Sequence, residues 1–154
     1  PDPSCGDGFA FAWIDATANA IGQAAATGSA LGTPTNLAGG AVAADLFLNE
    51  ENGDIVVPAL QVRSFDTTQT TADYAFVVAH QAIDPFINKW RKIAISVRGD
   101  DVTVRYDGSL NPVLTGKVPS VAKSTVGLTA ATGGLVSAAA VRNVHGRFYD
   151  CATP

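Results

Sequence analysis

Alternation of apolar and polar side chains along the chain predicts β-strands. In residues 92–108, Ile93, Ile95 and Val97 alternate with small or polar residues, and the same period of two returns after a turn at 99–100. Such a pattern is typical of a strand that packs one face on a core and turns the other toward solvent. We therefore predict a β-hairpin in this part of the chain.

Other segments repeat the pattern. Strands are expected at 8–14, 55–67, 74–83 and 141–150. Pro58 is expected at a bulge or at the start of its strand, because proline cannot donate to a central ladder. Two segments, 16–32 and 39–53, are permissive for helix, but glycines interrupt both, and the first is expected to be a loop. Many strands separated by turns predict an all-β fold, an antiparallel two-sheet sandwich or jelly roll.

The aromatic and histidine side chains on these strands favour structural roles. Trp13 and Trp90 are placed on strands, where a tryptophan more often belongs to the core than to a ligand-binding surface. His80 and His145 fall on different predicted strands, and neither has a serine or aspartate at triad-like spacing. We expect both histidines to be structural or exposed.

Length and composition limit the class of protein. The 154 residues correspond to a single domain, 1–154, and a hydrophobic content of 47% indicates a packed core. No apolar run reaches the roughly 18 residues of a membrane span. A net charge of −4 with only 10 Lys and Arg residues disfavours a nucleic-acid partner. Because Pro1 cannot start translation, we expect the numbering to begin after processing or at the boundary of an expressed fragment.

The two cysteines, Cys5 and Cys151, lie almost at the two ends of the chain. A metal site would need ligands in close pairs, which neither cysteine has. Two free thiols are one alternative. A disulfide joining the ends is favoured, because closing so long a loop would stabilise the fold by about 4–5 kcal/mol in the chain-entropy model. That bond implies an oxidising compartment, so we predict a secreted or extracellular-surface protein.

Five segments resemble, in order, the legume-type (L-type) lectins and the wider concanavalin A-like lectin and glucanase superfamily. GDGFAFAW (6–13) looks like the family's ADGFTF strand, ATGSALG (26–32) like its glycine-rich loop, and LQVRSFDT (60–67) like its VAVEFDT strand. Residues 89–116 are similar to its back-sheet hairpin, and 124–144 to its GFSAATGG segment with the strand that follows. The last match predicts a strand, a glycine turn and a closing strand. The resemblance implies a concanavalin A-like sandwich.

The same resemblance implies a sugar site. Asp7 would accept hydrogen bonds from sugar hydroxyls, and Gly28 and Gly32 would let backbone N–H groups approach a ligand closely. Without the resemblance, Asp7 is better explained as a turn residue that caps its own backbone; with the resemblance, the two explanations are equally supported. Without the resemblance, the glycines are explained by loop flexibility alone.

The metal ligands implied by the resemblance are incomplete. Family members that bind sugar do so beside a calcium ion and a transition metal, but Ser64 stands at the family's glutamate position. Asp66 is retained and Asp73 is a candidate second carboxylate, whereas Thr70 and Ala75 stand about where the family has Asn and His. Calcium takes six to eight oxygen ligands. At most one weakly bound calcium ion is therefore expected.

Three function classes stay open. The preferred one is a secreted, non-enzymatic module that binds a glycan or polysaccharide. The second is a structural or adhesive module of a larger surface protein or two-chain assembly, with a lost sugar site. The family has strands before its ADGFTF motif, so this domain would be a minimal version or would use another polypeptide, and an exposed sheet edge would accept a partner chain or a second copy. The third is a carbohydrate-active enzyme that uses aspartates. The family's glucanase motif needs glutamates on one face of a strand, and Glu50 and Glu51, the sole glutamates, are adjacent and cannot form it.

Overall fold

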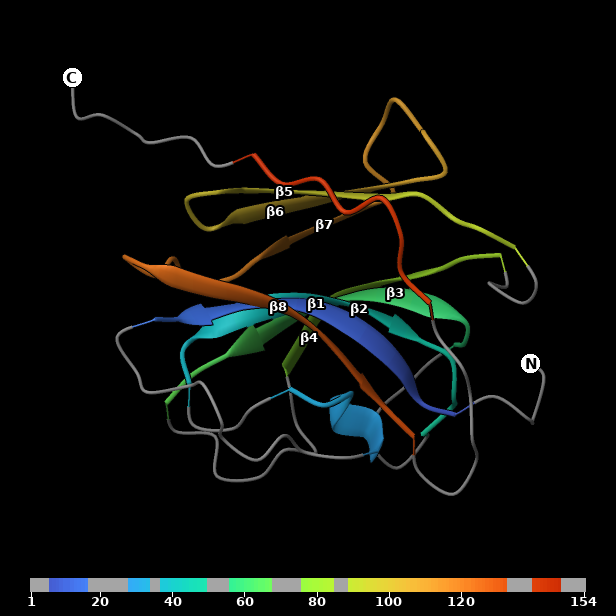
Figure 1. Ribbon diagram of the computed structural model, residues 1–154, viewed down its shortest axis with the longest axis horizontal. Helices are drawn as coiled ribbons and strands as arrows, with labels where there is room; N and C mark the ends of the chain where they lie inside the picture. Colours follow the sequence, from blue (N-terminus) through green and yellow to red (C-terminus); the bar gives the residue numbers. More distant parts are fainter. Residues whose placement is uncertain are drawn as a thin grey trace.

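Two antiparallel β-sheets are stacked face to face (Figure 1). This computed structural model describes residues 6–16, 28–33, 37–49, 56–67, 76–84, 89–132 and 140–147. The larger sheet has the order β4-β3-β2-β1-β8 and the smaller one the order β5-β6-β7. The strands are β1 (Gly8–Asp15), β2 (Gly39–Asp45), β3 (Ala59–Phe65), β4 (Phe76–Ala82), β5 (Ile93–Arg98), β6 (Asp101–Tyr106), β7 (Leu114–Lys117) and β8 (Ser124–Ala131). The predicted all-β sandwich is confirmed.

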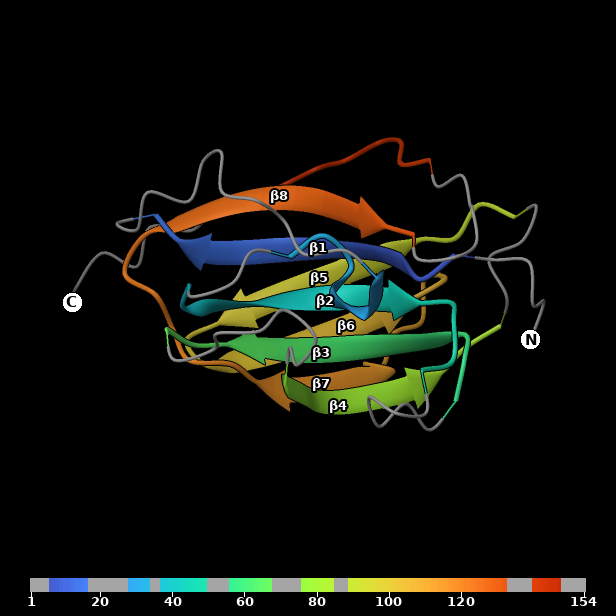
Figure 2. The ribbon, with the colours of Figure 1, turned by 90° about the horizontal axis from the view of Figure 1, so that it is seen from below.

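The hydrophobic core lies between the two sheets. Trp13, Val42 and Val62 of the large sheet are buried in one cluster with Val102 and Val104 of β6. β7 packs across β3 and β4, and Figure 2 shows the three-stranded sheet lying under β1 to β4 but not under β8. The sandwich is therefore closed on the β4 side and open on the β8 side.

The first and last strands of the described chain are neighbours. β1 pairs with β8 along its whole length, from Gly8 opposite Ala131 to Asp15 opposite Ser124. The other edge of β1 pairs with β2, so β1 is a central strand. β8 is the last strand among the described residues, whereas the predicted last strand, 141–150, is not formed in its described part. Cys5 and Cys151 lie outside the described residues, so their disulfide stays a prediction.

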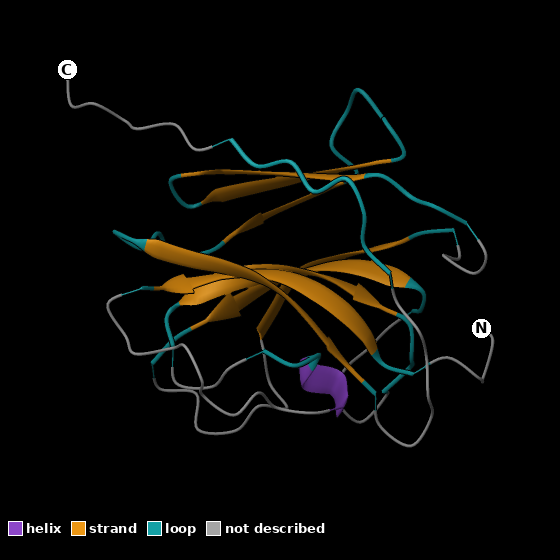
Figure 3. Ribbon diagram, viewed as in Figure 1, coloured by secondary structure: helices purple, strands orange, loops and turns teal. Residues whose placement is uncertain are grey.

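A second, smaller cluster covers the outer face of the large sheet. The 3₁₀ turn η1 (Gly28–Ala30) lies against this face, as Figure 3 shows, and Leu31 is buried there with Phe65. The strand residues beneath it are alanines: Ala10, Ala12, Ala41 and Ala43. Because alanine side chains are short, the loop backbone can approach the sheet closely. We call this side of the large sheet the site face.

Segment 39–53 has a helix-permissive composition, but its first seven residues form β2. All seven are buried, because β1 and β3 cover both edges and the two clusters cover both faces. A strand buried on both faces shows a continuous apolar run rather than alternation. Tertiary packing therefore overrides the weak helix propensity of its alanines.

The strand predicted at 141–150 is wrong for its described part. Residues 140–147 are irregular and exposed, although their sequence alternates. Alternation fits a strand only where a neighbouring strand supplies hydrogen bonds, and none is assigned to these residues. His145 is therefore not on a strand, and Trp90, 56% exposed, precedes β5 rather than lying in the core. No helix of the described residues is long and apolar enough to cross a membrane.

The packing predicts opposite effects for two glycines on strands. A Cβ added at Gly40 would lie 2.5 Å from Val118 Cγ1 and 2.8 Å from Trp13 Cζ2, whereas one at Gly127 meets nothing within 4 Å. We expect Gly40→Ala to lower the free energy of unfolding by about 1–3 kcal/mol through overpacking. The control Gly127→Ala should leave it unchanged or raise it slightly. Urea denaturation measures both, and equal stability of the two variants would contradict the inter-sheet packing.

Candidate functional site

Asp7 lies directly before β1, at the end of the large sheet where β2 ends. Its backbone carbonyl accepts a hydrogen bond of 2.8 Å from the N–H of Leu46. The residue is 4% exposed, and its Oδ2 has no hydrogen-bond partner among the described residues. A buried acceptor left without a partner costs about 1–3 kcal/mol. This atom would therefore gain from a donor such as a hydroxyl.

Glycine is required directly after Asp7. Gly8 has a φ of 140°, and a Cβ on it would lie 2.1 Å from the carbonyl oxygen of Ala44. Only a residue without a side chain permits this approach of β1 to β2. The Asp7-Gly8 pair therefore fixes the position of the Asp7 carboxylate at this end of the sheet.

The predicted glycine loop, Gly28–Thr33, packs on β8 next to this end. The N–H of Leu31 donates to Gly28 O at 2.9 Å, and the Thr33 hydroxyl donates to Ala30 O at 2.6 Å. Gly32 has a φ of 73°, and a Cβ on it would lie 2.9 Å from Ala130 O. Gly32 therefore permits close contact with β8. A Cβ added to Gly28, which has a φ of 65°, would meet nothing within 4 Å, so this position needs the left-handed backbone but not the space.

Thr129 of β8 carries a buried polar atom on the site face. It pairs with Ala10, whose side chain belongs to the cluster on this face. Its Oγ1 is buried and has no hydrogen-bond partner among the described residues. The loop and β8 therefore place this hydroxyl close to Gly32, since a Cβ on that glycine would lie 3.3 Å from Thr129 Cβ.

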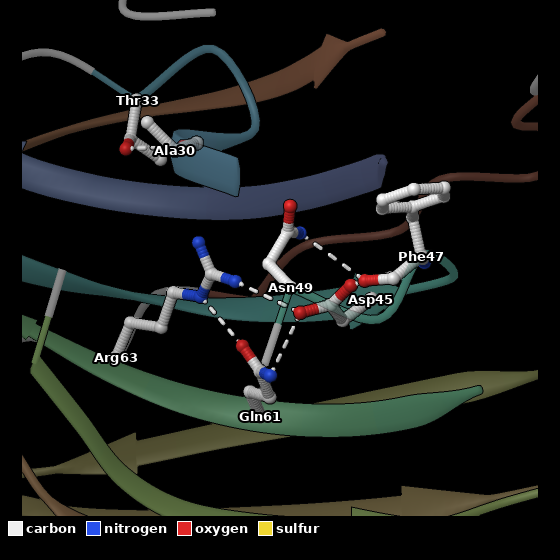
Figure 4. Close-up of polar contacts among 7 residues, drawn as sticks. All are labelled: Ala30, Thr33, Asp45, Phe47, Asn49, Gln61 and Arg63. Atoms are coloured by element: carbon white, nitrogen blue, oxygen red, sulfur yellow. Dashed lines mark hydrogen bonds and ion pairs between the residues drawn. The ribbon is translucent and has the colours of Figure 1, made fainter. Parts of the chain in front are cut away.

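Three residues that the sequence analysis did not identify, Asp45, Phe47 and Asn49, place further oxygen atoms at the Asp7 end of the large sheet. β2 ends at Asp45, which pairs with Gly8, and the chain then turns. The Phe47 N–H donates to Asp45 Oδ1 at 3.3 Å, and Asn49 Nδ2 donates to Phe47 O at 3.2 Å (Figure 4). The sequence signal for them is an Asp-x-Phe-x-Asn run directly after a buried strand. The helix-permissive composition of the segment obscures that signal.

A buried ion pair supports this turn. Arg63 Nη2 lies 3.3 Å from Asp45 Oδ2, with the two side chains 4% and 2% exposed. Gln61 joins them, since its Nε2 donates to Asp45 Oδ2 at 2.8 Å and its Oε1 accepts from Arg63 Nε at 2.8 Å. Arg63 and Gln61 pair with Ala41 and Ala43, so the network lies on the site face. The guanidinium supplies the positive charge that a buried carboxylate requires.

The predicted metal residue Asp66 lies elsewhere. The strand registers place Ala59, the first residue of β3, at the Asp7 end of the sheet and Phe65, its last, at the opposite end. Seven strand residues span about 20 Å, so Asp66 is remote from Asp7. Asp73 lies outside the described residues, and their pairing stays a prediction. Within the described ranges, no group of three or more His, Cys, Asp or Glu residues could hold a metal ion.

Comparisons with known proteins identify the fold. No family model matches the sequence, and no curated protein matches it. The structure is similar to the crystal structure of the VIP36 exoplasmic/lumenal domain in its Ca²⁺/Man3GlcNAc-bound form, with a TM-score of 0.61 and 19% identity. The match covers 88% of this chain and 58% of the VIP36 chain. The chain therefore has the fold of this VIP36 domain, a two-sheet β-sandwich, as the sequence resemblance implied.

The buried ion pair predicts a large and local effect on stability. Arg63→Met leaves the Asp45 carboxylate buried without its cation, so we expect the free energy of unfolding to fall by about 3–5 kcal/mol. A matched control is Lys117→Met, which removes the exposed pair to Asp101 at 2.8 Å. That variant should change stability little. If both variants unfold at the same urea concentration, Arg63 does not neutralise Asp45.

Proposed function

We propose that this chain is a non-enzymatic carbohydrate-binding module that binds a glycan at the Asp7 end of the large sheet. The observation that carries the proposal is the buried Asp7 carboxylate, whose Oδ2 has no partner among the described residues. A carboxylate can accept hydrogen bonds from two neighbouring hydroxyls, which is the pattern that a sugar ring offers. The Gly28–Thr33 loop, packed on β8 beside this end, would form the rim of the site.

The fold comparison supports the ligand class. The VIP36 structure that this chain resembles is described as Man3GlcNAc-bound. Its domain is also described as exoplasmic or lumenal, which supports a secreted or extracellular-surface location for this chain. The predicted disulfide between Cys5 and Cys151 belongs to the same proposal, because it would need an oxidising compartment.

One calcium ion is proposed at the turn that follows β2. Asp45 offers a carboxylate, Phe47 a backbone carbonyl and Asn49 a side-chain amide oxygen, which are the hard oxygen ligands that calcium prefers. The donor types suit calcium, but Asp45 Oδ1 and Oδ2 already accept hydrogen bonds from Phe47, Gln61 and Arg63, which calcium would have to replace or share. The ion pair of Asp45 with Arg63 lowers the negative charge available, so the proposed affinity is low. The VIP36 comparison, a Ca²⁺-bound form, supports this metal, and bound calcium would fix the turn beside Asp7.

A structural or adhesive role is the second candidate. Ser64 stands where the family resemblance places a glutamate, and Arg63 already neutralises Asp45. Both observations favour a scaffold that retains its fold without a metal. Glycan and calcium binding distinguish the two candidates.

Glycan binding should depend on Asp7. We expect the protein to bind Man3GlcNAc or other members of a glycan array, and Asp7→Asn to weaken that binding at least about tenfold, because a charged acceptor is lost. Asp101→Asn, on β6 in the other sheet, is the matched control and should bind normally. An array on which the unaltered protein binds nothing would refute the proposal, as would unchanged binding by Asp7→Asn.

Calcium should raise the thermal stability of the chain. A ligand that binds the folded state alone increases the melting temperature, so we expect a rise in millimolar CaCl₂ that EDTA reverses. Asn49→Ala should reduce this rise, whereas Asp66→Asn should preserve it. Scanning calorimetry measures both variants. If Asp66→Asn reduces the rise and Asn49→Ala preserves it, calcium binds at the Asp66 end of the sheet, as the sequence resemblance indicated.

A further inference from the structure

We propose that the open side of the sandwich binds an acidic, extended segment of a partner polypeptide as an additional β-strand. The open side is defined by the free edge of β5, the inward-facing residues Val126 and Leu128 of β8, and the segment 140–147 beside them. It lies apart from the Asp7 site, so this inference is independent of glycan binding.

The inner face of β8 is apolar and uncovered. Val126 pairs with Trp13 and Leu128 pairs with Phe11, and directly opposite residues of an antiparallel pair share a face. Trp13 belongs to the core between the sheets, so both β8 side chains point the same way. They are nevertheless 41% and 49% exposed, because in the described part of the chain the smaller sheet ends at β5 and does not extend under β8 (Figure 2).

The apolar surface continues onto β5. Ile95 pairs with Val104 and Val97 with Val102, and both β6 partners are buried in the core. The β5 side chains thus face inward, but Val97 is 46% exposed and Ile95 is only half-buried. Inward-facing residues that remain exposed indicate a missing neighbour on this side.

The backbone of β5 presents unused hydrogen-bonding groups at the same place. The Asp107 N–H donates to Lys92 O at 2.8 Å, so these residues form a hydrogen-bonded pair. Such pairs alternate along an antiparallel ladder, which turns the N–H and C=O groups of Ile93, Ile95 and Val97 away from β6. Among the described residues, no backbone hydrogen bond reaches these groups. A sheet edge of this kind is a template for an added strand.

Segment 140–147 runs along the open side without closing it. Figure 1 shows it at the level of the smaller sheet, and Figure 2 shows it beyond β8, on the side away from β1. Among the described residues it has no strand pairing. The Arg142 guanidinium lies 3.8 Å from the centre of the Trp90 ring, which holds the segment next to the start of β5. Its Val141 and Val144 are 49% and 62% exposed.

The positive charge of the side chains around the open side favours an acidic partner. β5, β8 and segment 140–147 contain no acidic residue, and exposed cations lie within or directly before them in the sequence: Lys92, Arg98, Lys123, Arg142 and Arg147. The acidic residues opposite β5 are Asp101, which pairs with Arg98, and Asp107, which lies opposite Lys92. However, Asp101 also binds Lys117, and Asp107 also binds Arg91. A second copy paired antiparallel about Ile95 would bring Arg98 opposite Lys92, which is unfavourable. A strand with acidic residues on its outward face would complement these cations. The occupant we infer is therefore a different, acidic segment that alternates with apolar residues.

The test uses a capped seven-residue peptide that alternates valine with glutamate, and a counterpart with lysine in place of glutamate. We expect the glutamate peptide to shift the amide signals of residues 93–98 in NMR spectra and to protect the amides of Ile93, Ile95 and Val97 from hydrogen exchange. The lysine peptide should bind at least about tenfold more weakly than the glutamate peptide. High salt should reduce this difference in affinity, because it screens the charges.

Variants separate the backbone and apolar contributions. Val97→Pro removes an outward N–H without touching the β6 ladder and should weaken peptide binding about tenfold, whereas Val97→Ala, which keeps the N–H, should weaken it less. Leu128→Ser should also weaken binding, and Leu110→Ser, at a loop residue 92% exposed, should not. Circular dichroism checks that each variant is folded.

Several results would overturn the proposal. These are equal affinity for the two peptides, no binding of either, or amide shifts confined to residues away from β5 and β8. Light scattering that shows a dimer of the protein, converted to a monomer by Val97→Pro, would instead identify a second copy as the occupant. Glycan binding should be unchanged in Val97→Pro, so failure of either proposal leaves the other testable.

Discussion

The pairing of β1 with both β2 and β8 is the constraint on which the architecture depends. β1 is central in the large sheet, and its two neighbours come from distant parts of the chain. This arrangement brings the residue before β1, the turn after β2 and the loop packed on β8 to one end of the sheet. Long-range pairing of this kind costs loop-closure entropy before its contacts form, so the site cannot assemble ahead of the sheet.

The sequence predicted the parts of the fold that alternate. The hairpin of β5 and β6 and the aromatic strand β1 were located because one face of each is apolar and the other polar or small. β2 was not, since Ala41 to Ala44 are buried on both faces and show no period. The segment 140–147 has the period of a strand but no partner strand among the residues that the structure describes. Periodicity reports which faces are apolar, but hydrogen-bonding partners are set by tertiary structure.

The residues of the candidate site were only partly identified from the sequence, because some of them depend on strands that alternation does not reveal. Asp7, Gly28 and Gly32 were identified by family resemblance, and the structure shows that Gly32 contacts β8 while Asp7 is buried beside the turn after β2. Asp45 and Asn49 were missed because they follow a strand that the sequence did not reveal. The buried network with Gln61 and Arg63 could not be inferred from spacing, because it depends on the lateral register of β2 and β3.

β8 serves two surfaces with alternate residues, since Thr129 faces the loop on the site face and Leu128 faces the open side. A slip of this strand by a single residue would exchange the two sets, presenting a leucine to the glycine loop and a threonine to the apolar side. The contact of Gly32 with the Ala130 backbone opposes that slip, because it holds the strand at one position. Point substitutions in β8 can therefore alter one surface and spare the other, while an insertion or deletion there would abolish both together.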